Sequence, residues 1–156
     1  MLPLLAALVA LPFVSPSPLQ ARFVDPHECA PSPFVITNFS TFESVSESGT
    51  SSTISFTLTN PNPGGDIPRE CEASYPAGGS VVDTTGTSHG CSFSGSYFTY
   101  PAQGGLIAWQ PMGCPTLETD VVAGGNGTVS LACTQGKNGV ICVQDGDAEI
   151  VATWAD

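Results

Sequence analysis

Thr53-Ile-Ser-Phe-Thr-Leu-Thr59 alternates polar and apolar residues over its whole length. A period of two residues is typical of a β-strand that packs one face on a core, so we expect Ile54, Phe56 and Leu58 to point inward. No segment repeats apolar residues at the helical period, and the 17 glycines and 14 prolines of the chain disfavour helices. This stretch therefore predicts an all-β protein.

Similar strand signals recur on both sides of this stretch, separated by clusters of Gly, Pro, Asn, Asp and Ser. Many short strands at such spacing predict a sandwich or a barrel, and no linker is long enough to divide the chain. We therefore expect a single-domain antiparallel β-barrel or sandwich, stapled by disulfides. The other expected strands cover residues 33–39, 92–100, 106–110, 117–122, 127–134, 140–144 and 148–154, and the expected turns include 46–52, 60–66, 76–79, 104–105, 124–127 and 136–139.

The N-terminal segment has the character of a signal peptide. Residues 1–14 are almost uniformly apolar, and this run is shorter than the about 20 residues that cross a membrane. Small and helix-breaking residues follow up to Ala21, where we place the cleavage site. We expect residues 1–21 to be removed and residues 22–156 to form a secreted, extracellular domain without a membrane anchor.

The chain is strongly acidic, with a formal net charge of −11. Such a surface repels nucleic-acid phosphates and anionic lipids, so we expect neither nucleic acid nor membrane as a partner. The sequence has no Cys-x-x-Cys, and only His27 and His89 could join cysteines in a zinc site. We therefore expect no metal and no cofactor.

All six cysteines, namely Cys29, Cys71, Cys91, Cys114, Cys133 and Cys142, lie in the expected secreted part. An even number of cysteines in a secreted domain implies disulfides. If residues 136–139 form a hairpin loop, Cys133 lies directly opposite Cys142. Facing Cα atoms in an antiparallel pair are about 4.5–5.5 Å apart, within the range of a disulfide. The register therefore predicts a Cys133–Cys142 bond.

Signals for catalysis are weak. There is no Gly-x-Ser-x-Gly, and a Ser-His-Asp triad would need His27 or His89 as its base. His89 lies in a turn-rich segment, where we expect a solvated loop histidine, and His27 lies near the expected mature N-terminus. Paired carboxylates can hydrolyse glycosides, but 14 acidic residues bring some pair together readily by chance. We expect no catalytic residues and keep a small secreted glycoside hydrolase as an alternative.

Two further features bear on the surface. The sequons Asn38-Phe-Ser40 and Asn126-Gly-Thr128 predict N-glycosylation, at Asn126 first because it lies in an expected turn, and at the less accessible Asn38 of an expected strand. Exposed aromatic side chains would favour a cell-wall carbohydrate-binding module, which is a second alternative, although core packing is their commoner role. The candidate aromatics are Tyr97, Phe98, Tyr100, Trp109 and Trp154.

A series of motifs resembles the family of fungal secreted proteins built on the domain of the Alternaria major allergen. The motifs are Phe34-Val-Ile-Thr-Asn-Phe39, Ile54-Ser-Phe-Thr-Leu58, Cys71-Glu-Ala-Ser, Cys91 ahead of Phe98-Thr-Tyr100, and a late paired-cysteine region with Cys142. The resemblance implies a secreted, cysteine-bridged β-barrel that is associated with virulence, plant defence responses or allergenicity. It does not imply an enzymatic reaction.

The resemblance also bears on the remaining cysteines. Carried over by position, it implies a Cys71–Cys91 bond and an upstream partner for Cys142. In the family an early cysteine such as Cys29 can bridge two subunits in a homodimer. Here Cys114, which has no clear equivalent in the family, offers Cys29 an internal partner, and we expect the Cys29–Cys114 bond.

Our leading interpretation is therefore a secreted effector-like or allergen-like binding protein without catalytic activity. Its partner would be a host protein or a small apolar or carbohydrate ligand. We expect the binding surface on loops, because loops of a β-barrel vary without disturbing the core. The loops that we consider first are residues 60–66, 81–89 and 124–127.

Overall fold

The computed structural model describes residues 29–114 and 119–154, so the expected signal peptide, residues 1–21, lies outside the described residues. The described chain is nearly all β-structure, with one short 3-10 helix, η2 (Ser46–Ser48). The strands are β1 (Phe34–Ser44), β2 (Ser52–Thr59), β3 (Arg69–Tyr75), β4 (His89–Gly90), β5 (Tyr97–Ala102), β6 (Gly105–Cys114), β7 (Thr119–Thr128), β8 (Leu131–Gly136), β9 (Gly139–Gln144) and β10 (Ala148–Trp154).

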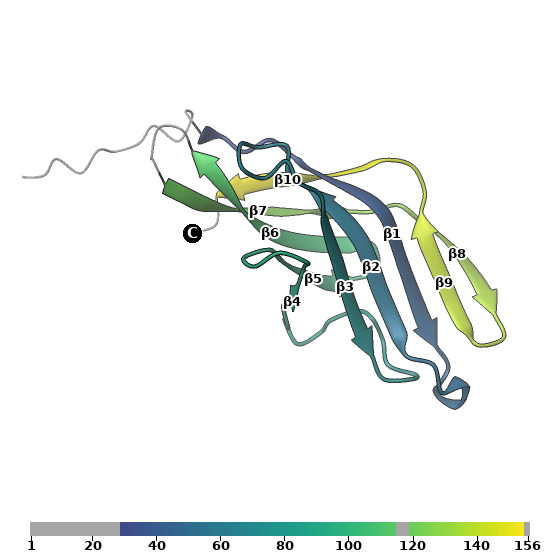
Figure 1. The fold of residues 1–156 in the computed structure, drawn as a ribbon. Helices are drawn as coiled ribbons and strands as arrows, with labels where there is room; N and C mark the ends of the chain where they lie inside the picture. Colours follow the sequence, from purple (N-terminus) through teal and green to yellow (C-terminus); the bar gives the residue numbers. More distant parts are fainter. Residues whose placement is uncertain (1–28, 115–118, 155–156) are drawn as a thin grey trace, which may run out of the picture.

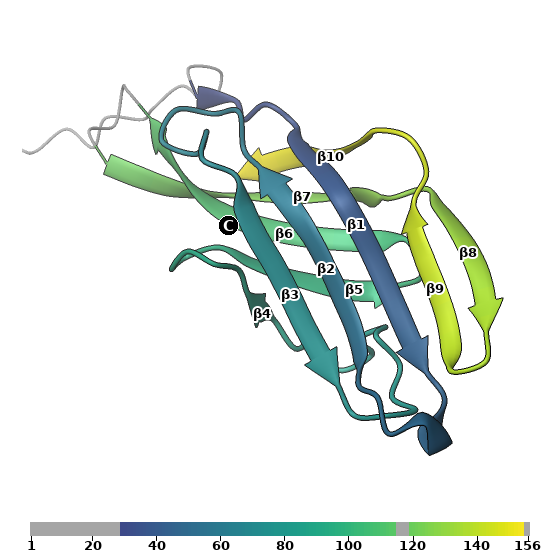
Figure 2. The same ribbon diagram turned by 45° about the vertical axis from the view of Figure 1, so that its right-hand side comes forward.

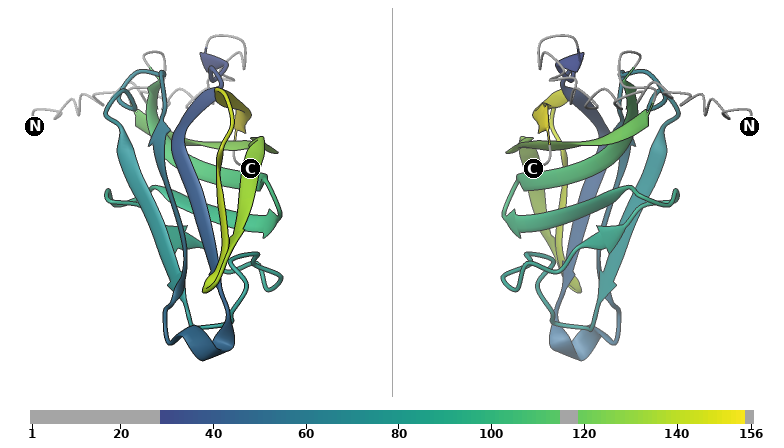
Figure 3. Two further views of the ribbon diagram at one scale, coloured as in Figure 1. Left: turned by 90° about the vertical axis from the view of Figure 1, so that its right-hand side faces the viewer. Right: turned by 90° about the vertical axis from the view of Figure 1, so that its left-hand side faces the viewer.

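The strands form one antiparallel sheet in the order β3-β2-β1-β10-β7-β6-β5-β4, with the β8–β9 hairpin attached to β1 through β9 (Figure 1). Figures 2 and 3 show β1, β2 and β3 as one wall and β5, β6 and β7 as the other, with the strands of the two walls crossing. This arrangement is a nearly closed antiparallel barrel, which confirms the expected fold class. No helix in the described part of the chain is long and apolar enough to cross a membrane.

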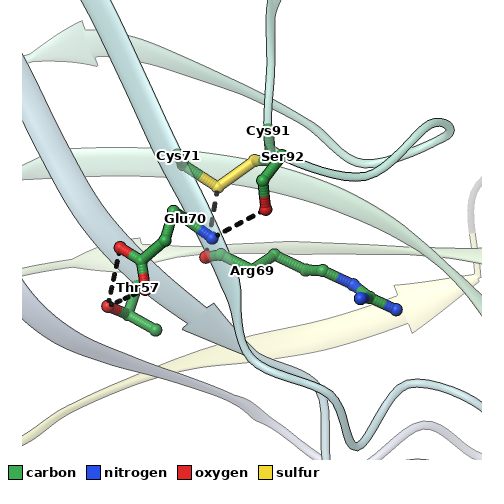
Figure 4. Close-up of a disulfide and its surroundings, with 6 residues drawn as sticks. All are labelled: Thr57, Arg69, Glu70, Cys71, Cys91 and Ser92. Carbon is green, nitrogen blue, oxygen red and sulfur yellow. Dashed lines mark hydrogen bonds between the residues drawn. A yellow bond between two sulfur atoms is a disulfide. The ribbon is translucent and has the colours of Figure 1, made fainter.

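The barrel closes along a seam between β3 and the segment that joins β4 to β5. The Cys71–Cys91 disulfide crosses this seam with a Cα–Cα distance of 4.1 Å (Figure 4). Beside it, the Ser92 N–H donates to the Glu70 carbonyl oxygen at 2.7 Å, and the Glu70 N–H donates to Ser92 Oγ at 3.1 Å. Strand pairing at the seam is reduced to an isolated antiparallel bridge between Cys71 and Cys91, so the disulfide and these hydrogen bonds hold the two edges together.

The core lies between the two walls and is rich in aromatic rings. Ile54, Phe56 and Leu58 are all buried, as the alternation at residues 53–59 predicts. The Phe56 ring packs on Phe39, with centroids 5.5 Å apart, and meets Phe98 edge-on at 4.9 Å. Such pairs add to the stability that comes from burial of their apolar area.

The three disulfides join the pairs expected from the sequence. Cys133 faces Cys142 in the β8–β9 hairpin, whose register is the expected one, at a Cα–Cα distance of 4.0 Å. Cys29 bonds to Cys114 at a Cα–Cα distance of 5.8 Å, which is the internal alternative for Cys29.

The expected turn at residues 124–127 is wrong, because these residues lie within β7 and pair with both β6 and β10. The glycines serve close packing instead of a turn. A Cβ atom on Gly125 would lie 2.9 Å from the Phe34 ring, and one on Gly127 would lie 2.9 Å from Ile150. A Cβ atom on Gly124 would lie 3.1 Å from the Trp109 indole.

Several strands differ from expectation. The short β4 was not expected, β5 begins at Tyr97 instead of residue 92, and residues 127–128 belong to β7, so that β8 begins only at Leu131. β1 and β3 differ as well. β1 runs on to Ser44 past a bulge at Asn38, whose φ of 56° is in the left-handed region. β3 was not expected as a strand, although its residues alternate between buried and exposed. Its inward positions are Arg69, Cys71 and Ala73, and the charge of Arg69 hides the apolar alternation.

Candidate functional site

Several buried polar atoms have no hydrogen-bond partner in the described part of the chain. Buried polar groups are normally hydrogen-bonded, so each exception calls for a cause. All of the exceptions come from one stretch of sequence, between the end of β2 and the middle of β6. They are Asn60 Nδ2, Arg69 Nε, Asp83 Oδ2, Ser96 Oγ and Gln110 Oε1.

Arg69 and Gln110 line the same cavity, which has a volume of about 130 Å³. Three segments that are distant in sequence build it: the β2–β3 loop together with the first residue of β3, the loop that carries Phe93, and β6. The full lining is Gly64, Arg69, Phe93, Gln110, Pro111, Met112 and Gly113. We call it the Arg69 cavity.

The β2–β3 loop is held against β6 by its backbone. The Gly113 N–H donates to the Pro63 carbonyl oxygen at 2.6 Å. Gly64 has a φ of 77°, and a Cβ atom there would lie 3.2 Å from the Gly113 nitrogen. Within the loop, Asn60 Oδ1 accepts a hydrogen bond from the Asn62 N–H at 2.9 Å. This Asx-turn fixes the start of the loop.

Arg69 is one of only three basic residues in the chain, yet it is 8% exposed. Its guanidinium carbon lies 4.1 Å from the centroid of the half-exposed Phe93 ring, a cation–π contact. Figure 4 shows the side chain extending away from the neighbouring Glu70, whose carboxylate accepts from the Thr57 hydroxyl instead. Among the described residues, the buried Arg69 Nε has no hydrogen-bond acceptor.

Gln110 contributes an unused acceptor. It is 1% exposed, and its Nε2 donates to the Gly65 carbonyl oxygen at 3.5 Å. The opposite atom of the amide, Oε1, has no partner. The Arg69 cavity thus combines a buried positive charge, a buried acceptor, and the apolar side chains of Phe93 and Met112.

A second hollow lies around the β3–β4 connection. It has a volume of about 310 Å³ and is lined by Tyr75, Ser80, Val82, Asp83, Thr84, Thr85, Thr87 and His89. His89 is half-buried in β4, so the expectation of a solvated loop histidine is wrong. Its Nε2 lies 2.9 Å from the Tyr75 hydroxyl, and its ring packs on Phe98 at 5.3 Å.

Hydrogen bonds, burial and neighbouring charges shift the pKa values of Asp83 and Tyr75 in this second hollow. Asp83 Oδ1 accepts from the Thr85 N–H and the Thr85 hydroxyl, both at 2.8 Å, and these bonds lower the pKa of Asp83. A contribution from His89 lowers it further. Burial, and then the charge of Asp83, raise the pKa of Tyr75. His89 Nε2 faces a phenol instead of a serine, which is not the geometry of a Ser-His-Asp triad.

The candidate aromatics divide between the inside and the outside of the barrel. Phe98 and Tyr100 are buried in the core. Tyr97, which is 47% exposed, faces the half-buried Trp109 across the β5–β6 pair. The side chain of Trp154 lies outside the described residues.

The two sequon asparagines are both exposed. Asn126 lies on β7, not in a turn, and its side chain points to solvent. Asn38 lies at the bulge in β1 and is exposed although it stands in a strand. In the described ranges, no three His, Cys, Asp or Glu side chains lie close enough together to hold a metal ion.

Two of the three candidate binding segments, residues 60–66 and 81–89, each contribute to the lining of one hollow, whereas residues 124–127 lie in β7. Arg69, Phe93 and Gln110 were not among the expected site residues. The sequence does contain one signal for Arg69, which is one of only three Lys and Arg residues and lies two residues before Cys71. Because alternate side chains of a strand share a face, Arg69 lies on the inner face of β3 together with Cys71.

Comparison with solved structures supports the fold. The chain is similar to a crystal structure of the Alternaria alternata major allergen Alt a 1, with a TM-score of 0.54, 19% identity, and coverage of 79% of this chain and 94% of that chain. A second crystal structure of Alternaria alternata allergen Alt a 1 gives a TM-score of 0.55 and 19% identity, with coverage of 78% and 88%. No family model matches the sequence, and no curated protein matches it. The expected resemblance is thus confirmed at the level of the fold.

Proposed function

We propose that this chain is a secreted, allergen-like binding protein without catalytic activity, and that its ligand binds beside the seam of the barrel. The observation that carries the proposal is the Arg69 cavity, where Arg69 Nε and Gln110 Oε1 are buried without a protein partner. A bound ligand would supply the missing partners.

Further support comes from the architecture. Three disulfides suit an extracellular protein, because such bonds persist in oxidising compartments. The Cys71–Cys91 bond and the hydrogen bonds between Glu70 and Ser92 hold the two sides of the cavity in place before any ligand arrives. A preorganised site loses less entropy on binding.

A fragment and glycan screen on the mature protein, residues 22–156, tests this proposal. We would titrate ¹⁵N-labelled protein and locate ligand-induced shifts on the structure. Shifts should cluster on the loops around Arg69 and Phe93, and Phe93→Ser should weaken them. Val151→Ser, at an apolar β10 position that is 64% exposed, is the matched control and should have no effect.

Turnover assays complete the test. Polysaccharide, ester and peptide substrates should all remain unchanged by the mature protein. A measured hydrolytic activity that one Asp→Asn or Glu→Gln substitution abolishes would refute the binding-protein proposal in favour of a glycoside hydrolase.

A carbohydrate-binding module is the second candidate, because Tyr97 and Trp109 form a cross-strand pair on the outside of β5 and β6. Sugar rings stack on such aromatic faces. Pull-down on chitin, glucan and cellulose separates the two candidates. Retention that is lost in Tyr97→Ala and Trp109→Ala, but kept in Phe93→Ser, would favour the carbohydrate-binding module.

A further inference from the structure

We propose that the Arg69 cavity binds a small organic acid with one carboxylate and an adjacent hydroxyl group, that is, a short 2-hydroxycarboxylate. This inference rests on the proposed binding function and names the class of its ligand. It follows from three properties of the cavity: its charge, its unused acceptor and its size.

The charge calls for an anion. Removing a guanidinium from water is costly unless a counter-charge or hydrogen-bond acceptors replace the water. Arg69 is 8% exposed and its Nε has no acceptor among the described residues. Phe93 lies over one face of the guanidinium, and because the N–H groups lie in the guanidinium plane, the ring does not occupy their hydrogen-bonding directions. That donor geometry matches a carboxylate.

The unused acceptor calls for a donor on the same ligand. Gln110 Nε2 faces the Gly65 carbonyl oxygen, so the amide presents Oε1 as the atom without a partner. An ionised simple carboxylate has no proton to donate to it. A hydroxyl beside the carboxylate supplies that proton while the carboxylate accepts from Arg69. One small molecule then satisfies both buried groups.

The volume of the cavity and the net charge of the protein further limit the class of ligand. The cavity volume of about 130 Å³ is close to the about 150 Å³ of a cavity that holds benzene. A body of a few carbon atoms fits beside Phe93 and Met112. The net charge of −11 opposes polyvalent anions, and the single guanidinium matches a single negative charge. A monocarboxylate is therefore preferred over a phosphate or a dicarboxylate.

Three probes of nearly the same shape test the proposal on the mature protein with its disulfides intact, at neutral pH. Lactate has both groups, propionate lacks the hydroxyl, and lactamide lacks the charge. In ¹⁵N NMR titrations, lactate should give saturable shifts around Gly64, Arg69 and Gly113. Propionate should bind about five-fold more weakly, which is the value of one hydrogen bond, and lactamide should not saturate.

Variants assign the contributions. Arg69→Gln should weaken lactate binding by more than about ten-fold, because it removes a charge-assisted hydrogen bond. Gln110→Met should reduce lactate binding to that of propionate, with no effect on propionate itself. Lys137→Gln makes the same change in net charge at an exposed hairpin position and should leave lactate binding unchanged.

Equal binding of lactate and lactamide by the wild-type protein would overturn the proposal, and so would unchanged lactate binding in Arg69→Gln. If Arg69→Gln does not fold, the wild-type comparison and Gln110→Met decide the question. The proposed function fails separately. If no probe binds but screen ligands still shift the seam loops, the ligand class is wrong and the binding function stands.

Discussion

Replacement of Gln144 by methionine should destabilise the barrel at the point where β1 changes partners. The first part of β1, from Phe34 to Ile36, pairs with β10, and its last part, from Ser40 to Ser44, pairs with β9. Between these two parts of β1, the side-chain amide of Gln144 hydrogen-bonds to the β1 backbone. Its Nε2 donates to the Ile36 carbonyl oxygen at 2.8 Å, and its Oε1 accepts from the Phe39 N–H at 3.1 Å.

The size of the effect follows from these two bonds. Methionine keeps the length and most of the volume of glutamine but can make neither bond. Each hydrogen bond contributes about 0.5–1.5 kcal/mol net, so their loss should cost about 1–3 kcal/mol in the free energy of unfolding. A third bond, from Nε2 to the Gly146 carbonyl oxygen at 2.9 Å, is exposed and should add little.

Urea unfolding with the disulfides intact measures this cost, provided that the m-value is unchanged. Gln135→Met is the matched control, since the Gln135 amide bonds only to carbonyl groups of its own hairpin. It should change the free energy of unfolding by less than about 0.5 kcal/mol. Hydrogen exchange at the Phe39 amide should quicken only in the Gln144 variant. A cost below about 0.5 kcal/mol for Gln144→Met, or an equal cost for both variants, would refute this account.

Three further predictions concern pH and packing. The main-chain hydrogen bond from Thr85 is the chief cause that lowers the pKa of Asp83 below its ordinary value of 3.8. The ionised Asp83 therefore stabilises the fold above about pH 4, and this stabilisation is lost as the pH falls through the folded-state pKa. Asp83→Asn should therefore flatten the decline of stability in acid urea titrations. Burial raises the pKa of Tyr100 above its ordinary value of 10.0. The neutral Tyr100 side chain therefore stabilises the fold below that pH, and this stabilisation is lost as the pH rises through the folded-state pKa. Tyr100→Phe should remove this alkaline decline, and at neutral pH it should cost about 1–3 kcal/mol in urea unfolding, because a buried main-chain N–H loses its acceptor. Gly125→Ala should cost about 1–3 kcal/mol by overpacking the core, whereas Gly90→Ala, with no atom within 4 Å of the new methyl group, should be nearly neutral in thermal unfolding.

The sequence by itself determined the local features of this fold. The alternation at residues 53–59 predicted both the strand and its buried face, because successive side chains of a strand point to opposite sides. The pairing of Cys133 with Cys142 followed from the short loop between them, which fixes the register of a hairpin. Both depend only on residues that are close together in the chain.

The tertiary structure decided the role of the glycines in β7. The clustered glycines at residues 124–127 predicted a turn, because such clusters usually mark one. Phe34 and Ile150 lie so close to β7 that Cβ atoms on Gly125 and Gly127 would collide with them, and a Cβ atom on Gly124 would make a tight contact with Trp109. A short local pattern contains no information on which distant side chains will press on it.

The same physical reason separates the predicted loops from the site itself. Composition indicated that residues 60–66 form a loop, and the structure agrees. Only closure of the barrel brings Arg69, Phe93 and Gln110 together. Closure also buries the Arg69 side chain, whose charge would be exposed to water if only its neighbours in sequence surrounded it. Burial, and the absence of a partner for Arg69 Nε among the described residues, arise where three distant segments meet across a seam, so no single stretch of sequence encodes them.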